Sequence, residues 1–339
     1  MEYSLITTLE NLDQLAPEWN DLLAQSAVNV PFLRHEYLRA WFQTLGGGEW
    51  PTGELAVVTA RKGGELAGIA PFFLTERDGE PLLVLLGGIE ISDYLDMIVR
   101  PEDLPDFITG LFDFLAGRAG LPAWRGLELY NLPDSSPTLA ALQADSAKCS
   151  WTCTIEPFRP AVYVPLAGDF ETYLAGIDKK QRHEIRRKMR RAEESGLGVR
   201  WYIVEDESTL DAEIDDLIAL MANDDHKEEF LTEVMRTQMR ASVHAAFKAG
   251  WLQLAFLEVS GKKAAGYLNF DYDNRIWVYN SGLDFEFREL SPGWVLLGYL
   301  LQWANENGRR EFDFMRGDEE YKFKFGGIQS WVMKVKITR

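Results

Sequence analysis

The sequence has few of the residues that build disulfide frameworks, metal sites or membrane spans. Its two cysteines, Cys149 and Cys153, lie four positions apart, and none of the four histidines is near enough to complete a metal site. We therefore expect reduced thiols and no metal. No run of 18 apolar residues occurs, and the first residues are acidic rather than leader-like. These features predict a cytoplasmic protein without membrane insertion.

Several catalytic motifs are missing as well. The patterns HExxH, GxSxG and GxxxxGK[ST] do not occur, so zincin, serine-hydrolase and P-loop chemistry have no support. The net charge is -18, which argues against DNA as a partner because phosphate neutralisation needs a basic surface. Residues 179–191 are the exception, with eight Lys or Arg against one Glu. Since only this segment offers a surface for tRNA, we do not expect tRNA as a partner.

What the chain does contain is enough apolar residues for two domains: 46% of its 339 residues are hydrophobic and 12% are aromatic. The segment RKGGELAGIAPF at 61–72 aligns with VSGKKAAGYLNF at 259–270. In both halves the order strand, helix, strand follows. This repetition predicts a duplicated α/β unit, divided into residues 1–158 and 159–339.

The chemistry is concentrated between residues 279 and 325. Residues 275–279 have the composition of a strand. A helix is expected from Ser291-Pro292-Gly293 to about residue 307, because Ser is a favoured N-cap and Pro is tolerated at the first helical position. The strand 312–314 and a loop with lysines follow.

The start of this helix is a candidate phosphate site. Its first N–H groups lie at the positive end of the helix dipole, Gly293 permits close approach to the backbone, and Arg288 supplies a matching charge. The equivalent helix of the first half opens with acidic residues at 102 and 103, which would repel phosphate. The alternative is that Ser-Pro-Gly only caps a core helix.

The basic segment 179–191 reads as an amphipathic helix. Its apolar stripe is bordered by Arg182, Arg186 and Arg190, which are spaced four residues apart. Such a row suits bidentate capture of a substrate phosphate or carboxylate. The alternative is that the arginines pair with carboxylates of this acidic protein.

The chain resembles the tandem-domain GNAT-fold acyltransferases of the BioF2-like, or CelD-like, group, which are relatives of the FemAB peptidyltransferases. The resemblance is carried by KKQRHEIRRKMRRAEESG at 179–196, YNSGLD at 279–284, LSPGWVLL at 290–297 and FDFMRGDEEYKFKFG at 312–326. It implies an α/β (α+β) fold of two GNAT-like domains, each with a mixed, mainly antiparallel sheet flanked by helices. Only the second domain is expected to bind the acyl donor.

The resemblance also implies direct attack of an acceptor amine on the thioester of acetyl-CoA or another acyl-CoA, used as a co-substrate. The expected catalytic residues are Tyr279, Asp284, Asp313, Tyr321 and Lys322. The expected donor-binding residues are Asn280, Arg288, Ser291, Pro292 and Gly293. The expected acceptor-binding residues are Asp93, Tyr94, Asp96, Arg182 and Arg186.

The acceptor is expected to be a small-molecule or glycan-linked amine, and a sugar- or cell-wall/polysaccharide-related substrate is one candidate. Two alternatives stay open. One is FemAB-type aminoacyl transfer from tRNA. The other is a non-catalytic GNAT-fold module in polysaccharide biosynthesis, which Ser291 favours because it stands where the pyrophosphate-binding turn of GNAT enzymes has glycine.

Overall fold

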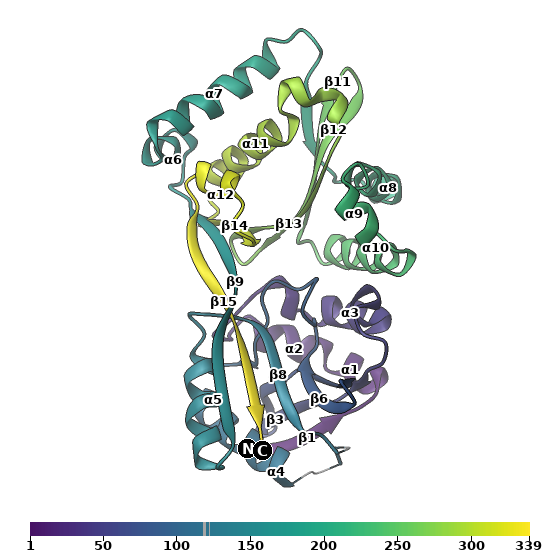
Figure 1. Ribbon diagram of the computed structural model, residues 1–339, viewed down its shortest axis with the longest axis vertical. Helices are drawn as coiled ribbons and strands as arrows, with labels where there is room; N and C mark the ends of the chain where they lie inside the picture. Colours follow the sequence, from purple (N-terminus) through teal and green to yellow (C-terminus); the bar gives the residue numbers. More distant parts are fainter. Residues whose placement is uncertain (118–119, 122) are drawn as a thin grey trace. The chain divides into compact units, whose positions relative to one another are not determined.

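The structure is a computed structural model that describes residues 1–117, 120–121 and 123–339. The chain forms two compact units (Figure 1). Unit 1 comprises Met1–Pro160 and Trp331–Arg339, and unit 2 comprises Ala161–Ser330. The last segment therefore belongs to unit 1, whereas the division at residue 158 left it in the second half.

Unit 2 is built on a mixed, mainly antiparallel sheet. Its strands follow the order β10 (Arg200–Ile203), β11 (Leu252–Val259), β12 (Lys262–Tyr272), β13 (Arg275–Leu283), β14 (Glu311–Arg316) and β9 (Thr152–Pro165). All neighbours are antiparallel except β13 and β14, which are parallel. A parallel pair needs a crossover connection, and the helix expected after Ser291 provides it.

Helices cover both faces of this sheet. One face carries α6 (Phe170–Gly176), α7 (Lys179–Glu193) and α11 (Pro292–Glu306), and the other carries α8 (Leu210–Met221), α9 (Asp225–Phe230) and α10 (Glu233–Lys248) (Figure 1). The predicted apolar stripe of α7 is confirmed, since Ile185, Met189 and Ala192 are its buried residues. They pack with α11 in one core, which is why α11 is apolar on nearly every side.

Two irregularities of β13 shape the candidate site. The register with β12 pairs Leu268 with Asn280 and Asn269 with Val278, so Tyr279 is the extra residue of a β-bulge. The pairing of β13 with β14 extends only from Arg275 to Trp277. Beyond that point the two parallel strands separate, and their main chains are no longer joined to each other.

Unit 1 repeats this plan in part. Its first sheet has the order β1 (Glu2–Ile6), β3 (Val57–Lys62), β4 (Glu65–Ala70) and β7 (Ile98–Val99). Its second group of paired strands has the order β15 (Ile328–Thr338), β8 (Gly126–Pro133), β6 (Glu80–Leu85), β5 (Phe72–Arg77) and β2 (Glu54–Leu55). β6 and β8 are parallel, like β13 and β14.

The helices of unit 1 include one that the sequence pattern missed. They are α1 (Leu9–Gln14), α2 (Ala16–Leu23), α3 (His35–Gly48), α4 (Leu104–Gly117) and α5 (Pro137–Lys148). Residues 132–136 are rich in turn-forming residues, and the residues after them have weak apolar periodicity. Ser136 nevertheless caps α5 by accepting a hydrogen bond from the N–H of Thr138. Within the described residues, no helix has the length and apolar content that a membrane span requires.

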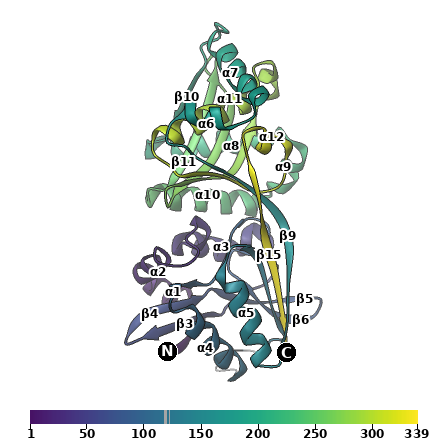
Figure 2. The ribbon, with the colours of Figure 1, turned by 90° about the vertical axis from the view of Figure 1, so that its left-hand side faces the viewer.

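The long strands β9 and β15 are continuous in sequence across the unit boundaries (Figure 2). One boundary falls inside β9, between Pro160 and Ala161, and the other falls inside β15, between Ser330 and Trp331. Unit 2 is therefore a continuous stretch of chain inserted between two pieces of unit 1.

Candidate active site

The first turn of α11 is open at its N-terminus. Ser291 has a left-handed conformation (φ 53°, ψ 55°), and its side chain makes no capping hydrogen bond. Its carbonyl accepts the N–H of Val295 at 3.0 Å. Among the described residues, none accepts a hydrogen bond from the N–H groups of Gly293 or Trp294. An anion at this helix start would meet two unsatisfied donors and the positive end of the dipole.

Gly293 is also needed for packing. A Cβ built at this position would lie 2.7 Å from Cδ2 of Leu283, on the end of β13. The absent side chain thus lets α11 begin directly against the strand. Arg288, in the short 3-10 helix Phe285–Leu290 before Ser291, is exposed.

An arginine-lined hollow adjoins this helix start. It has a volume of about 440 Å³ and is lined by Arg187, Arg190, Arg191, Glu194, Ser195 and Leu290. Leu290 immediately precedes Ser291, and the charged residues come from the C-terminal half of α7 and the residue after it. The hollow therefore places cationic side chains beside Leu290, the residue that precedes Ser291.

Lys188 adds a further cation at the same end of α11. Its Nζ lies 4.2 Å from the ring centroid of Trp294, in a cation–π contact. Burial lowers the pKa of Lys188, and the nearby Glu184 carboxylate opposes that change. Trp294 in turn packs on Phe325, with ring centroids 4.6 Å apart.

Two lysines and one carboxylate lie near the point where β13 and β14 separate. Lys322, in α12 (Glu320–Lys324), is only 3% exposed. Its Nζ donates to the carbonyls of Arg316 and Gly317 at 2.6 and 3.1 Å and lies 2.9 Å from Oε2 of Glu319. These three partners account for all three of its N–H bonds.

The second lysine comes from the opposite face of the sheet. Lys227 of α9 donates from Nζ to Oδ1 of Asn280 at 3.1 Å and to the carbonyl of Ser281 at 2.5 Å. Burial lowers its pKa, while the charges of Asp224 and Glu319 raise it. Lys227 thus holds the chain just after the bulge of β13.

Three predicted catalytic residues lie on or near the same strands. Tyr279 is half-buried and packs on Phe270 with ring centroids 5.2 Å apart. Asp313 is buried, and its Oδ1 accepts the N–H of Met315 at 2.6 Å. Tyr321 packs edge-on against Phe314, and burial raises its pKa, so that its hydroxyl keeps its proton at neutral pH.

Comparisons with known proteins identify the fold of this chain. Residues 179–323 match the family model described as "Acetyltransferase (GNAT) domain". This chain has the GNAT fold. The predicted family and the predicted fold class, α/β with mainly antiparallel sheets flanked by helices, are thereby confirmed.

The similarity to solved structures covers nearly the whole length of this chain. FemX has a TM-score of 0.68 at 11% identity, covering 98% of this chain and 97% of that chain. A conserved protein of unknown function from Bacteroides thetaiotaomicron has a TM-score of 0.61 at 12% identity, with all of both chains covered.

The C-terminal domain of a candidate lysylphosphatidylglycerol synthetase from Agrobacterium fabrum has a TM-score of 0.59 at 12% identity, covering 97% of this chain and 92% of that chain. Among curated proteins, none matches the chain.

The remaining predicted residues of the GNAT domain have structural contacts. Asp284 caps the 3-10 helix after β13 by accepting the N–H of Glu286 at 2.8 Å. Arg182 donates to the carbonyls of Leu174 and Ala175 at 3.4 and 3.3 Å, and Arg186 pairs with Glu171. Both arginines thus connect α7 to α6, and Arg186 makes the pairing with a carboxylate that the alternative for this row described.

The three predicted acceptor residues of the first half lie in unit 1. Asp93 is half-buried, and Tyr94 is 6% exposed. Asp96 is wholly buried, and its carboxylate accepts the hydroxyl of Ser136 and the N–H of Met97. Asp96 therefore supports the cap of α5, and its side chain has no surface to offer an acceptor.

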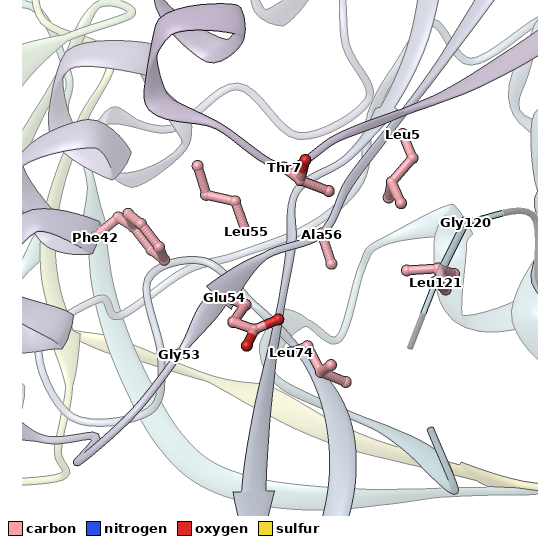
Figure 3. A pocket seen from close by; sticks show the side chains of 10 residues that line it. All are labelled: Leu5, Thr7, Phe42, Gly53, Glu54, Leu55, Ala56, Leu74, Gly120 and Leu121. Atoms are coloured by element: carbon pink, nitrogen blue, oxygen red, sulfur yellow. The ribbon is translucent and has the colours of Figure 1, made fainter. Parts of the chain in front are cut away.

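Unit 1 also contains a hollow of different character. It has a volume of about 370 Å³ and is lined by Leu5, Thr7, Phe42, Gly53, Glu54, Leu55, Ala56, Leu74, Gly120 and Leu121 (Figure 3). This lining contains one carboxylate and no cationic side chain. It gives a phosphate nothing comparable to the arginines beside α11.

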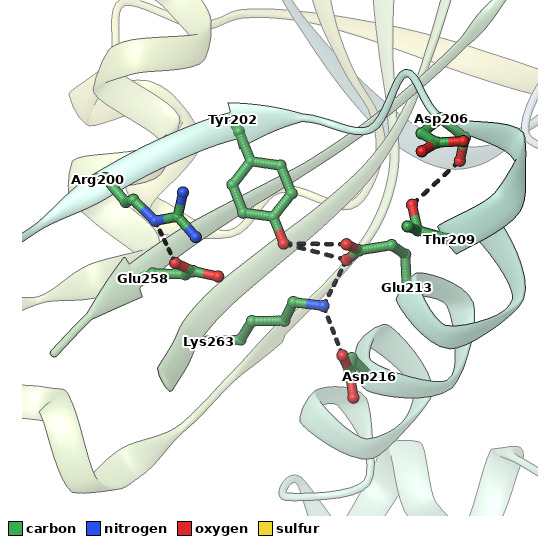
Figure 4. A network of polar contacts seen from close by, with 8 residues as sticks. All are labelled: Arg200, Tyr202, Asp206, Thr209, Glu213, Asp216, Glu258 and Lys263. Carbon is green, nitrogen blue, oxygen red and sulfur yellow. Dashed lines mark hydrogen bonds and ion pairs between the residues drawn. The ribbon is translucent and has the colours of Figure 1, made fainter. Parts of the chain in front are cut away.

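A separate polar network lies on the α8 side of the sheet in unit 2. Lys263 lies 2.5 Å from both Glu213 and Asp216, and Tyr202 donates to Glu213 (Figure 4). Burial of Lys263 opposes its charge, but these carboxylates raise its pKa overall. Each charge is paired, so the network fastens α8 to β10 and β12.

Sequence reasoning missed Lys227 and Glu319. The polar run around His226 forms the helix that carries Lys227, and His226 itself is exposed. Only the contact with Asn280, which is 53 positions away, reveals the place of Lys227. Among the described residues, no group of three or more His, Cys, Asp or Glu side chains could hold a metal ion.

Proposed function

We propose that unit 2 transfers an acyl group from an acyl-CoA to the amine of a small-molecule or glycan-linked acceptor. The observation that carries this proposal is the open start of α11, where the N–H groups of Gly293 and Trp294 lack partners among the described residues. The diphosphate of CoA is an anion that suits such a site. The hollow lined by Arg187, Arg190 and Arg191 adds positive charge beside it.

The separation of β13 and β14 supports the same proposal. A pantetheine arm that starts at the diphosphate can place its thioester near the bulge at Tyr279, where β13 no longer pairs with β14. In the reaction, the acceptor nitrogen attacks the thioester carbon, a C–N bond forms, and the C–S bond breaks. The leaving thiolate then needs a proton, and the hydroxyl of Tyr321, which is protonated at neutral pH, is our candidate donor.

A binding experiment tests the donor. CoA is expected to raise the melting temperature of the protein, since a ligand that binds only the native state stabilises it. Arg288→Glu reverses the charge of an exposed residue beside the helix start and should abolish the shift. Lys248→Glu makes the same charge change at an exposed position at the end of α10 and serves as the control. The absence of any shift at millimolar CoA would contradict the proposal.

A second candidate donor is aminoacyl-tRNA, and the observation that favours it is the basic surface of α7. Lys179, Lys180, Arg190 and Arg191 are exposed there. Retention of charged tRNA at low salt, lost in Arg190→Glu/Arg191→Glu, would favour this donor over CoA. Failure of the wild type to retain charged tRNA at low salt would exclude it.

A further inference from the structure

Lys227 has more hydrogen-bonding capacity than its contacts within the protein use. An ammonium group has three N–H donors. Two of them are satisfied by Oδ1 of Asn280 and the carbonyl of Ser281. No further hydrogen bond joins its Nζ to a described residue, whereas all three donors of Lys322 are used. Of these two lysines, only Lys227 has a donor left for a ligand.

Lys227 binds β13 just beyond the bulge of that strand. Its two partners directly follow the bulge residue Tyr279, beyond the end of the pairing between β13 and β14. Glu319, which pairs with Lys322, lies close enough to influence the charge of Lys227. The lysine is therefore at the opening between the strands, on the side of β13.

The surroundings make an additional negative oxygen favourable. Burial lowers the pKa of Lys227 and thus disfavours its charged form. Neither Asp224 nor Glu319 is an ion-pair partner of its Nζ among the described residues, although both act on it at longer range. A ligand oxygen that gains negative charge during a reaction would compensate the buried ammonium group.

We propose that Lys227 is a catalytic residue whose third N–H binds the carbonyl oxygen of the acyl group. This inference rests on the proposed function. When the acceptor nitrogen attacks, the C–N bond forms and the electrons of the C=O bond move to this oxygen, which Lys227 stabilises. The electrons then return, the C–S bond breaks, and the thiolate takes a proton from Tyr321, which is reprotonated from solution. Bulk base removes the proton of the amine. Preorganised donors of this kind contribute on the order of 10²–10³ in rate.

The competing explanation is that Lys227 only fastens α9 to β13. Infrared spectroscopy of bound [1-¹³C]acetyl-CoA separates the two, because a hydrogen bond to the carbonyl lowers its stretching frequency. We expect the frequency to fall when the wild type binds the ligand. Lys227→Met should bind acetyl-CoA and lose this shift, Lys227→Arg should retain part of it, and Lys262→Met should leave it unchanged.

The outcomes separate the proposed acyl transfer from the inferred role of Lys227. If the wild type binds neither CoA nor acetyl-CoA, the proposed function fails. If the wild type binds acetyl-CoA without a shift, or if Lys227→Met keeps the full shift, the inference about Lys227 fails while the proposed function stands. Should Lys227→Met prove unfolded by circular dichroism, the comparison is made with Lys227→Gln and Lys227→Arg. An undiminished shift in both would overturn the inference.

Discussion

At the scale of single residues, burial determines the pKa of a carboxylate and the space available for a side chain. Asp96 has no exposed surface, and burial raises its pKa from 3.8 to about 6, although hydrogen bonds from Ser136, Thr138 and Met97 oppose that change. The folded state therefore holds the proton of Asp96 more tightly than the unfolded chain does. The stability from this proton is complete below pH 3.8 and is lost as the pH rises through about 6.

Asp96→Asn should remove this pH dependence, because Asn stays neutral and keeps an acceptor for Met97. The difference in unfolding free energy, wild type minus Asp96→Asn, should fall by about 2–3 kcal/mol between pH 4 and pH 7. Urea unfolding at several pH values measures it. Asp318→Asn, at an exposed site, should show no such trend. If the difference in unfolding free energy between the wild type and Asp96→Asn did not change with pH, the buried carboxylate would be ionised at little cost in stability.

Gly282 shows the effect of an absent side chain. A Cβ on this residue would lie 2.5 Å from the backbone nitrogen of Met221 and 2.6 Å from the backbone carbon of Leu220. Backbone atoms of α8 cannot rotate away as a side chain would. Gly282→Ala should therefore destabilise the protein by about 3 kcal/mol, as overpacking does. Thermal unfolding measures the change. Gly176→Ala, where nothing lies within 4 Å, is the matched control, and equal stability of both variants would contradict the packing argument.

At the scale of elements, α7 combines two roles along its length. Arg182 and Arg186 near its N-terminus contact α6, and its buried residues pack against α11. Its C-terminal half instead supplies Arg187, Arg190 and Arg191 to the hollow beside Leu290. Only this half is placed to meet a ligand at the start of α11.

Arg190→Ala/Arg191→Ala should weaken CoA binding about tenfold, equivalent to about 1.4 kcal/mol for the loss of charge-assisted contacts. Lys179→Ala/Lys180→Ala removes the same charge from the other end of α7. Calorimetric titration of both variants at two salt concentrations measures the effect. The first variant should also show a weaker salt dependence. If the two variants lost affinity equally, the hollow would have no special role.

The elements also show how far the sequence could predict the fold. The helix 179–193, the helix after Ser291 and the hairpin of β11 and β12 follow from apolar periodicity and turn residues. The helix α5 was missed because Leu142 is its one buried large apolar residue, so its periodic signal is weak. The role of Lys227 could not be predicted, since it depends on the bulge of β13 and on a contact between residues far apart in sequence.

At the scale of the whole molecule, unit 1 is completed by chain that lies beyond unit 2. Residues 126–133 of β8 pair with 332–338 of β15. On β15, the side chains of Val332, Val335 and Ile337 are all fully buried. The core of unit 1 thus depends on residues that a division into an N-terminal and a C-terminal half assigns to the other half.

Ile337→Ala should destabilise unit 1 by about 2–4 kcal/mol through the cavity it creates. Hydrogen exchange measured by mass spectrometry should show faster exchange in β8, which pairs with Ile337 through Leu127. Thr338→Ala, at a half-buried neighbouring position, is the control. Faster exchange confined to β11–β13 would contradict the assignment of residues 331–339 to unit 1.

The interruption of unit 1 by residues 161–330 has a consequence for biosynthesis. A ribosome releases the chain in order, so all of unit 2 emerges before the strand that completes β8 exists. Unit 2 can therefore reach its native state while β8 of unit 1 still has an unpaired edge, because β15 has not yet been made. We therefore expect unit 1 to complete its folding after unit 2, although most of unit 1 is synthesised first. Nascent chains arrested before residue 331 should depend on chaperones to protect the unpaired edge of β8.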